Sequence, residues 1–489
     1  MSPVSLFLVV LAYFGLLLVV ARRTSRNATN DSFFNGNKSS NWLLVAFGMV
    51  GTTLSGVTFI SVPGAVGRDG FGYLQITLGY VLGYLCITFV LLPLYYRLRL
   101  SSIYHYLDVR LGRRAGQSGA ACFILSRTLG ASARLYLVIN ILQAVILDRL
   151  GLPFWLTSAV VLLMILLYTY EGGVKTIVWT DTLQTAGMLL GLLICVAYLL
   201  HAMELDLPSS LARMQDAGLA RVFTWDVDSP AYFWKQVLAG MFITIAMTGM
   251  DQEMMQKNIS VRTLADSQKN MLLLTAILVG VLALFLFLGG LLHLYAPLAG
   301  VSASGDKLFP AVVMGHLPAL VQLIFLLGLI SALFPSADGA ITALTSSFCI
   351  DLLGLTRRAD LDEAAKLRRR HHVHLGFCAL FLLLVLLFKW IDSASMIGVI
   401  LKLAGYTYGP LLGLFAFGML SRRGLRQRWV PLAVLAGPAL CNVVDRNQEL
   451  IFGSYRIGLE LLIMNGSLVL AALFLISLPA PAGPVANDG

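Results

Sequence analysis

Small polar residues crowd the middle of an otherwise apolar stretch, residues 42–66. Six of them fall within eight positions: Gly51, Thr52, Thr53, Ser55, Gly56 and Thr58. Glycine permits unusual backbone angles, and serine and threonine compete for backbone hydrogen bonds. Within a membrane, such a stretch predicts a broken helix whose freed carbonyls and hydroxyls hold an ion and a solute. The alternative is a small-residue face for helix packing.

Charged residues inside apolar segments form a second chemically capable group. They are Arg127, Arg134, Asp181, Asp251, Asp338 and Lys402. A charge at mid-membrane depth is costly, so each is a functional candidate. The alternative is an internal ion pair or a side chain that extends to the membrane interface, and this alternative is strongest for Asp251 and Lys402. No constellation of His, Cys and Asp typical of nucleophilic or metal chemistry occurs at mid-depth, so we expect no enzyme.

The composition places these residues in a polytopic membrane protein. Of the 489 residues, 58% are hydrophobic and 12% are charged, whereas soluble domains carry about 25% charged residues. The six cysteines lie one per apolar segment without CxxC spacing. We therefore expect them to pack in the core or against lipid, and to form neither disulfides nor a metal site.

Apolar windows of about 20 residues predict thirteen spans. They lie near 3–21, 42–66, 75–98, 117–147, 153–170, 176–203, 231–256, 268–296, 318–355, 374–391, 394–420, 429–446 and 457–478. The first has no preceding positive charge and is followed by Arg22 and Arg23, which indicates a retained first span and not a signal peptide.

The loop charges support an N-terminus outside. In that orientation the inner loops carry 23 Lys and Arg residues, Lys257 and Arg370 among them, and the outer loops carry 8. This asymmetry follows the positive-inside rule. The net charge of +10 therefore faces the cytoplasmic leaflet of the lipid bilayer, and no nucleic-acid partner is expected. His371, His372 and His374 fall in one basic loop and are expected to be solvated.

Two halves of the chain share a pattern. Span 7 contains Thr248–Gly249, a second Thr/Gly break five spans after the first. Interrupted segments in matching positions indicate inverted repeats, here spans 2–6 and 7–11. The predicted organisation is a first flanking helix and cytoplasmic loop (1–41), a first repeat (42–203), an extracellular loop with a short helix (204–230), a second repeat (231–420), and flanking helices with a short tail (421–489).

Four motifs, in the expected order, resemble those of the sodium/solute symporter family. They are GGVKTIVWTDTLQ at 172–184, DQEMMQ at 251–256, GYTYGPLLG at 405–413, and SAD at 336–338, where the family has a Ser/Thr-rich sodium motif. The chain is identified as a member of this family, and its site pattern is most similar to that of sodium–sialic acid members. The resemblance implies an all-α, LeuT-type five-plus-five inverted repeat with flanking helices.

The resemblance also implies a sodium site. Its ligands would come from Gly51, Leu54, Ala332, Pro335 and Ser336. Pro335 departs from the family, which usually has a hydroxyl there, and we hypothesise that Asp338 replaces the missing oxygen. The positions of a second sodium ion in some sialic acid members correspond to Asp181, Asp338 and Gly339. Asp181 could instead line the cytoplasmic exit path.

The solute positions that the resemblance implies surround the predicted break. They are Thr53, Ser55, Val57, Thr58, Arg127, Arg134 and Asp251. Val57 stands where the galactose transporter has a glutamate, which disfavours that mode of sugar binding. One of the two arginines could serve as the fork that reads a carboxylate, and the sequence does not decide which.

The expected function is a sodium-coupled symporter that imports a small polar solute, an acidic sugar or organic acid, by alternating access. Na+, the solute and the bilayer are the expected partners, and the expected location is the cell membrane, as a multi-pass protein of a bacterial inner membrane. Three alternatives stay open: a proton-coupled permease in which Asp338 titrates, an uncoupled channel or sensor, and a neutral sugar or amino acid as the solute.

Overall fold

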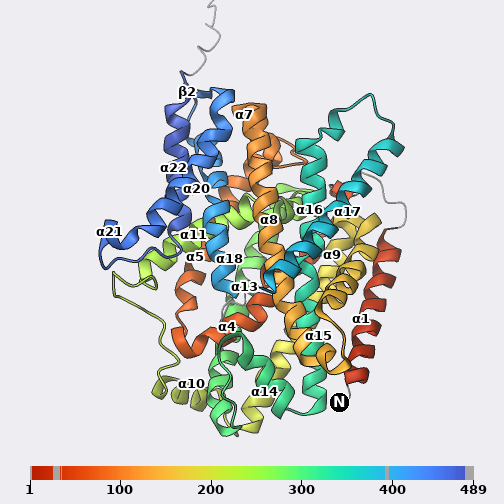
Figure 1. Ribbon diagram of the computed structural model, residues 1–489, viewed down its shortest axis with the longest axis vertical. Coiled ribbons are helices and arrows are strands. Elements are labelled where there is room, and N and C mark those ends of the chain that lie inside the picture. Colours follow the sequence, from red (N-terminus) through yellow and green to blue (C-terminus); the bar gives the residue numbers. More distant parts are fainter. Residues whose placement is uncertain (1–2, 26–32, 35, 391–395, 480–489) are drawn as a thin grey trace, which may run out of the picture.

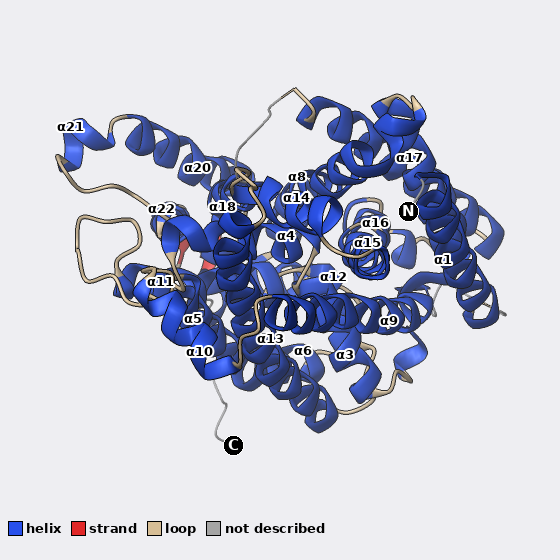
Figure 2. Cartoon of the chain, turned by 90° about the horizontal axis from the view of Figure 1, so that it is seen from below, coloured by secondary structure: helices blue, strands red, loops and turns tan. Residues whose placement is uncertain are grey.

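A computed structural model describes residues 3–25, 33–34, 36–390 and 396–479. The described chain is a bundle of helices with one two-stranded pairing, β1 (Gly424–Leu425) with β2 (Ser477–Leu478). Helix α1 lies at one side of the bundle and helices α20 to α22 lie at the other (Figure 1, Figure 2). The prediction of an all-α protein is confirmed.

The first half of the chain supplies the helices α1 (Pro3–Thr24), α3 (Trp42–Thr53), α4 (Gly56–Asp69), α5 (Tyr73–Cys86), α6 (Leu92–Arg97), α7 (Tyr104–Leu111), α8 (Arg113–Leu142), α9 (Phe154–Ala202) and α10 (Leu207–Asp216). Helix α10 is the short helix expected in the loop 204–230. Short π-helical segments continue α5 and α8, at Ile87–Leu91 and Gln143–Leu147.

The second half supplies α11 (Phe233–Thr244), α12 (Gln252–Ile259), α13 (Leu264–Leu298), α14 (Leu308–His316), α15 (Ala319–Leu333), α16 (Asp338–Ser347), α17 (Glu363–Phe388), α18 (Met396–Thr407), α19 (Gly409–Leu420), α20 (Val430–Arg446), α21 (Gln448–Phe452) and α22 (Leu461–Leu475). A 3-10 turn, Phe334–Ser336, joins α15 to α16.

The predicted break of span 2 is confirmed. Helices α3 and α4 meet at an angle of 54°. The two junction residues leave the helical conformation: Leu54 has φ −91° and ψ 51°, and Ser55 has φ −49° and ψ 171°. Irregular backbone in a bilayer must be buried in protein or line a cavity, so the break fixes where a polar site can lie.

The predicted break of span 7 is confirmed as well. Helix α11 ends in a π-helical turn, Ile245–Gly249, and Met250 and Asp251 are not helical. Asp251 is extended, and its carboxylate accepts the backbone N–H groups of Glu253 and Met254 at 2.9 and 3.2 Å. It therefore caps the N-terminus of α12, as aspartate commonly does.

Two further interruptions were not predicted. Helix α15 gives way to α16 through the 3-10 turn that contains Pro335, whose missing N–H removes a helical hydrogen bond. Residues 398–407 of α18 meet α19 at 42° around Tyr408, directly before Gly409 and Pro410. The described part of residues 231–420 thus has helix interruptions at Met250–Asp251, at Phe334–Ser336 and at Tyr408.

The span count stays a prediction. Among the described residues, seven helices are long and apolar enough to cross a membrane, or up to nine with the two bent pairs. The spans predicted at 153–170 and 176–203 are joined as α9, which is kinked at Gly173 with φ 57°. A side chain at Gly173 would overlap Phe33. The number thirteen, the outer N-terminus and the inverted repeats are not tested by these helices.

Two loop assignments were wrong. Helix α17 begins at Glu363, about three turns before the predicted span, and His374 on it is buried and hydrogen-bonds with Thr169 and Thr345 at 3.0 and 3.1 Å. Lys257 belongs to α12 and is 3% exposed. In both helices, α12 and α17, these polar side chains near the end of a predicted span face other parts of the protein. A charged or polar residue near a span end is therefore not always exposed to solvent.

Glycines allow the helices around the breaks to approach closely. A side chain at Gly240 of α11 would overlap the Ile76 carbonyl of α5, and one at Gly79 of α5 would lie 2.8 Å from the Met241 nitrogen. Small residues commonly mediate such contacts between helices in membranes. The α5–α11 contact therefore holds the first half of the chain against the second.

We predict that Gly240→Ala lowers the melting temperature of the detergent-solubilised protein. Overpacking of this kind costs about 1–3 kcal/mol. The matched control is Gly280→Ala in α13, where a new methyl group meets no atom within 4 Å and helix propensity improves. Equal melting of the two variants by intrinsic fluorescence would contradict the close packing.

Candidate functional site

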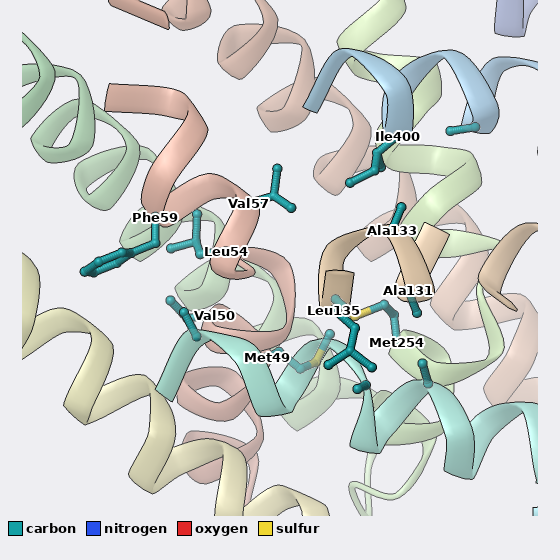
Figure 3. Packing of buried hydrophobic residues seen from close by; sticks show 14 of the residues in the cluster. Met49, Val50, Leu54, Val57, Phe59, Ala131, Ala133, Leu135, Met254 and Ile400 are labelled. Atoms are coloured by element: carbon teal, nitrogen blue, oxygen red, sulfur yellow. The ribbon is translucent and has the colours of Figure 1, made fainter. Parts of the chain in front are cut away.

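A cavity of about 120 Å³ lies beside the break between α3 and α4. Its lining includes Thr52, Thr53, Leu54, Ser55, Val57, Thr58, Tyr73, Tyr80, Tyr84, Arg127, Arg134, Thr244, Thr248, Met254, Ile400 and Leu401. Figure 3 shows Leu54 and Val57 on the bent segment, with Leu135, Met254 and Ile400 from other helices around it. The cavity thus joins both broken spans to α5, α8 and α18.

Six of the seven predicted solute residues line this cavity. Thr53, Ser55, Val57 and Thr58 come from the break, and Arg127 and Arg134 come from α8. Asp251 does not line it. Its carboxylate caps α12 and accepts a hydrogen bond from the Tyr408 hydroxyl at 2.8 Å, so the internal contacts that were the alternative for Asp251 are present.

The two arginines of α8 differ in their partners. Arg127 is buried and forms an ion pair with Glu253, and its Nη1 lies 3.9 Å from Asp251 Oδ2. Arg134 is half-buried, and no carboxylate of the described residues lies within ion-pair distance of its guanidinium. Arg134 is therefore the cavity arginine whose charge is available to a ligand.

A second ion pair joins α12 to α9 and α3. The Lys257 ammonium donates to Asp181 Oδ2 at 2.6 Å and to Thr52 Oγ1 at 2.7 Å. It also lies 3.4 Å from Glu253 Oε1. Because Arg127 contacts Glu253 from the other side, the two pairs form one buried cluster of Arg127, Asp181, Glu253 and Lys257.

The carbonyls predicted to bind sodium lie at the break. Within the described residues, the carbonyl oxygens of Gly51 and Leu54 accept no hydrogen bond. The start of α4 also approaches α15, since a side chain at Gly56 would lie 3.6 Å from the Ala332 carbonyl oxygen. Ser336 is buried, and its hydroxyl is 3.4 Å from that same oxygen. The predicted sodium residues therefore belong to two adjacent, interrupted spans.

Asp338 lies two positions after the 3-10 turn, at the start of α16. Its Oδ2 accepts a hydrogen bond from the Tyr168 hydroxyl at 2.8 Å, and its Oδ1 accepts the Gly339 N–H at 2.5 Å. Both oxygens are thus engaged within the protein. The hypothesis that Asp338 completes the sodium shell beside Pro335 stays a prediction.

Sequence reasoning missed Glu253 and Lys257. Both follow Asp251 closely and were treated as residues near the end of a span. The signal was their spacing, because an acidic and a basic residue four apart share one face of a helix. Lys402, in contrast, lies 3.0 Å from Asp445 and is largely exposed, which confirms the alternative offered for it.

We predict that Arg127→Met destabilises the protein by about 3–5 kcal/mol, because it leaves Glu253 buried with one cation fewer. The double variant Arg127→Met/Glu253→Gln should recover most of the melting temperature. Arg358→Met is the control, since its pair with Asp360 is solvent-exposed and such pairs contribute about 0–1 kcal/mol. A double variant that melts no higher than Arg127→Met would contradict the pairing.

Known proteins similar to this chain are sodium-coupled transporters. The human sodium/iodide cotransporter is 27% identical over 85% of this chain, and the human sodium-coupled monocarboxylate transporter 2 is 24% identical over 83% of it. The chain spans 64% and 66% of the length of these two relatives.

The fold is also that of a solved symporter. A sodium-coupled sialic acid symporter, solved in a substrate-bound outward-open state, matches with a TM-score of 0.82 and 16% identity. The match covers 96% of this chain and 97% of that one. The helical transporter fold expected from the LeuT-type resemblance is confirmed at this level.

The family profile covers most of the chain, residues 33–427, including both broken spans and the cavity between them. This agrees with a multi-pass membrane protein that is a transporter and not an enzyme. The chain belongs to the sodium:solute symporter family.

Proposed function

We propose that this protein is a sodium-coupled symporter that imports a small carboxylate-bearing solute. The observation that carries the proposal is Arg134, which lines the cavity at the helix break without a carboxylate partner among the described residues. A buried or half-buried cation without a counter-charge is costly. An anionic solute supplies that counter-charge.

The chemistry of the rest of the cavity fits such a solute. Arginine presents a planar fork that matches a carboxylate in two parallel hydrogen bonds. Thr53, Ser55 and Thr58 add hydroxyl groups to the cavity lining. Tyr73, Tyr80 and Tyr84 add aromatic rings that each carry a hydroxyl group. The cavity can thus bind both the carboxylate and the remaining polar groups of an acidic sugar or an organic acid.

The names of the relatives point the same way. Iodide, monocarboxylates and sialic acid, named for proteins similar to this chain, are all anions at neutral pH. Neutral sugars and amino acids were the alternative solutes. Two observations favour the anion: position 57 is valine and not glutamate, and the Arg134 guanidinium has no carboxylate partner among the described residues.

Sodium is the coupling ion in this proposal. The carbonyls of Gly51 and Leu54 at the break and the Ala332 carbonyl with Ser336 across from it form an oxygen-rich contact between two spans. Sodium bound there holds α3 against α15 and so favours the arrangement that accepts the solute. Solute and ion then leave together when the two repeats rock past one another in the bacterial inner membrane.

We predict that Arg134→Gln weakens binding of carboxylate solutes about 10- to 100-fold, since hydrogen bonds to charged groups contribute about 1.5–3 kcal/mol. Purified protein is screened by thermal shift in sodium against sialic acid, pyruvate, galactose and proline. The control is Arg114→Gln, an exposed arginine on the same helix. If a galactose or proline shift survives Arg134→Gln, or no carboxylate stabilises the wild type, the anionic solute is refuted.

We predict that replacing sodium by choline at fixed pH abolishes uptake of the identified solute into proteoliposomes. Ser336→Ala should raise the sodium concentration for half-maximal uptake several-fold, whereas Ser304→Ala, in a loop before α14, should not. Uptake in choline that follows a proton gradient would favour the proton-coupled alternative. Uptake that needs neither gradient would favour a channel.

A further inference from the structure

The Lys257 ammonium is held by oxygens from three helices. Its Nζ lies 2.6 Å from Asp181 Oδ2 of α9, 2.7 Å from Thr52 Oγ1 of α3, and 3.4 Å from Glu253 Oε1 of α12. Hydroxyl and carboxylate oxygens are the ligands that a hard cation prefers. The ammonium is therefore placed as a bound metal ion would be, except that it is covalently attached to α12.

A fourth helix, α16, makes room for this ammonium at Gly339. A side chain at Gly339 would begin 3.2 Å from Lys257 Nζ and would overlap the Glu253 carboxylate. The bare backbone of Gly339 thus accommodates the Lys257–Glu253 pair. A serine or threonine side chain at position 339 would therefore occupy space that the Lys257–Glu253 pair fills in this structure.

Asp181 and Gly339 are two of the three positions at which a second sodium ion was expected. The third, Asp338, accepts hydrogen bonds from the Tyr168 hydroxyl and from the Gly339 backbone N–H. The ammonium lies on the Asp181 carboxylate and against Gly339. A sodium ion at the same place would meet a like charge within contact distance, with little water to screen the repulsion.

We propose that Lys257 is a tethered cation that takes the place of the second sodium ion, so that this chain binds one sodium ion and not two. The inference rests on the proposed sodium coupling for the first ion, but it concerns a different set of residues. It makes Lys257 the residue that determines the ion stoichiometry.

Removal of the ammonium should open a sodium site. Asp181 Oδ1 accepts no hydrogen bond from the described residues, and without Lys257 the Oδ2 atom and the Thr52 hydroxyl would also lose a donor. Three oxygens would then surround a space with uncompensated negative charge. A small cation is the ligand that such a space favours.

The test counts sodium ions by equilibrium binding of ²²Na+ to the purified full-length protein. We expect one ion per wild-type chain and two per Lys257→Met chain. Lys257→Arg, which keeps the charge, should bind one. If Lys257→Met does not fold, Lys257→Ala/Gly339→Ser replaces it, since the small alanine leaves space and the serine adds a hydroxyl ligand; two ions are again expected.

Two matched controls separate the site from general charge effects. Lys257→Met/Asp181→Asn removes both charges of the pair and should bind one ion. Lys269→Met removes an exposed lysine from the neighbouring helix α13 and should also bind one. A gain of sodium in either control would overturn the assignment to Asp181.

The remaining outcomes also decide the matter. Two ions on the wild type, or no gain in either Lys257 variant that lacks the charge, would overturn the proposal. A wild type that binds no sodium would refute the proposed sodium coupling instead. The tethered cation would then still be supported by a gain of one ion in Lys257→Met, and refuted by no gain.

Discussion

The structure depends on the balance of charge inside the bundle. An isolated ion in a low-dielectric interior is strongly disfavoured, and a buried pair is stable only with good geometry and further hydrogen bonds. Here Glu253 forms ion pairs with both Arg127 and Lys257. Lys257 also forms an ion pair with Asp181. Asp251 caps α12 and accepts a hydrogen bond from the Tyr408 hydroxyl. The short helix α12 is thereby joined by ion pairs to α8 and α9, and by hydrogen bonds to α3 and to the junction of α18 and α19.

This cluster also explains why the break in span 7 is tolerated. Backbone that leaves the helix in a membrane must find other partners. Asp251 supplies them through its side chain, and the ion pairs of the following residues hold α12 in place. The break and the cluster are therefore one arrangement, and the cavity forms where it meets the break in span 2.

Much of the site was predictable from local sequence. The break at Leu54 and Ser55 follows from glycine, serine and threonine at mid-depth, and Arg134 was detectable as a charge in an apolar segment. Glu253 and Lys257 were not identified, because their depth depends on the π-helical turn at Ile245–Gly249 that precedes them. The joint at Tyr408 was missed although Gly409 and Pro410 directly follow it, because proline is tolerated in the first turn of a helix and does not by itself show that the chain bends there. His374 shows the same limit at a span end: burial there is decided by neighbouring helices, which composition does not reveal.

The contact of Lys257 with Asp181 has a consequence for energetics. The Lys257 ammonium is covalently part of the protein and is not released on either side of the membrane. It therefore adds nothing to the net charge that one transport cycle moves across the membrane. One sodium ion moving with one monovalent anion is electroneutral, and the membrane voltage then does no work on the pair. The highest accumulation of solute would equal the ratio of sodium concentrations across the bilayer, whatever the voltage.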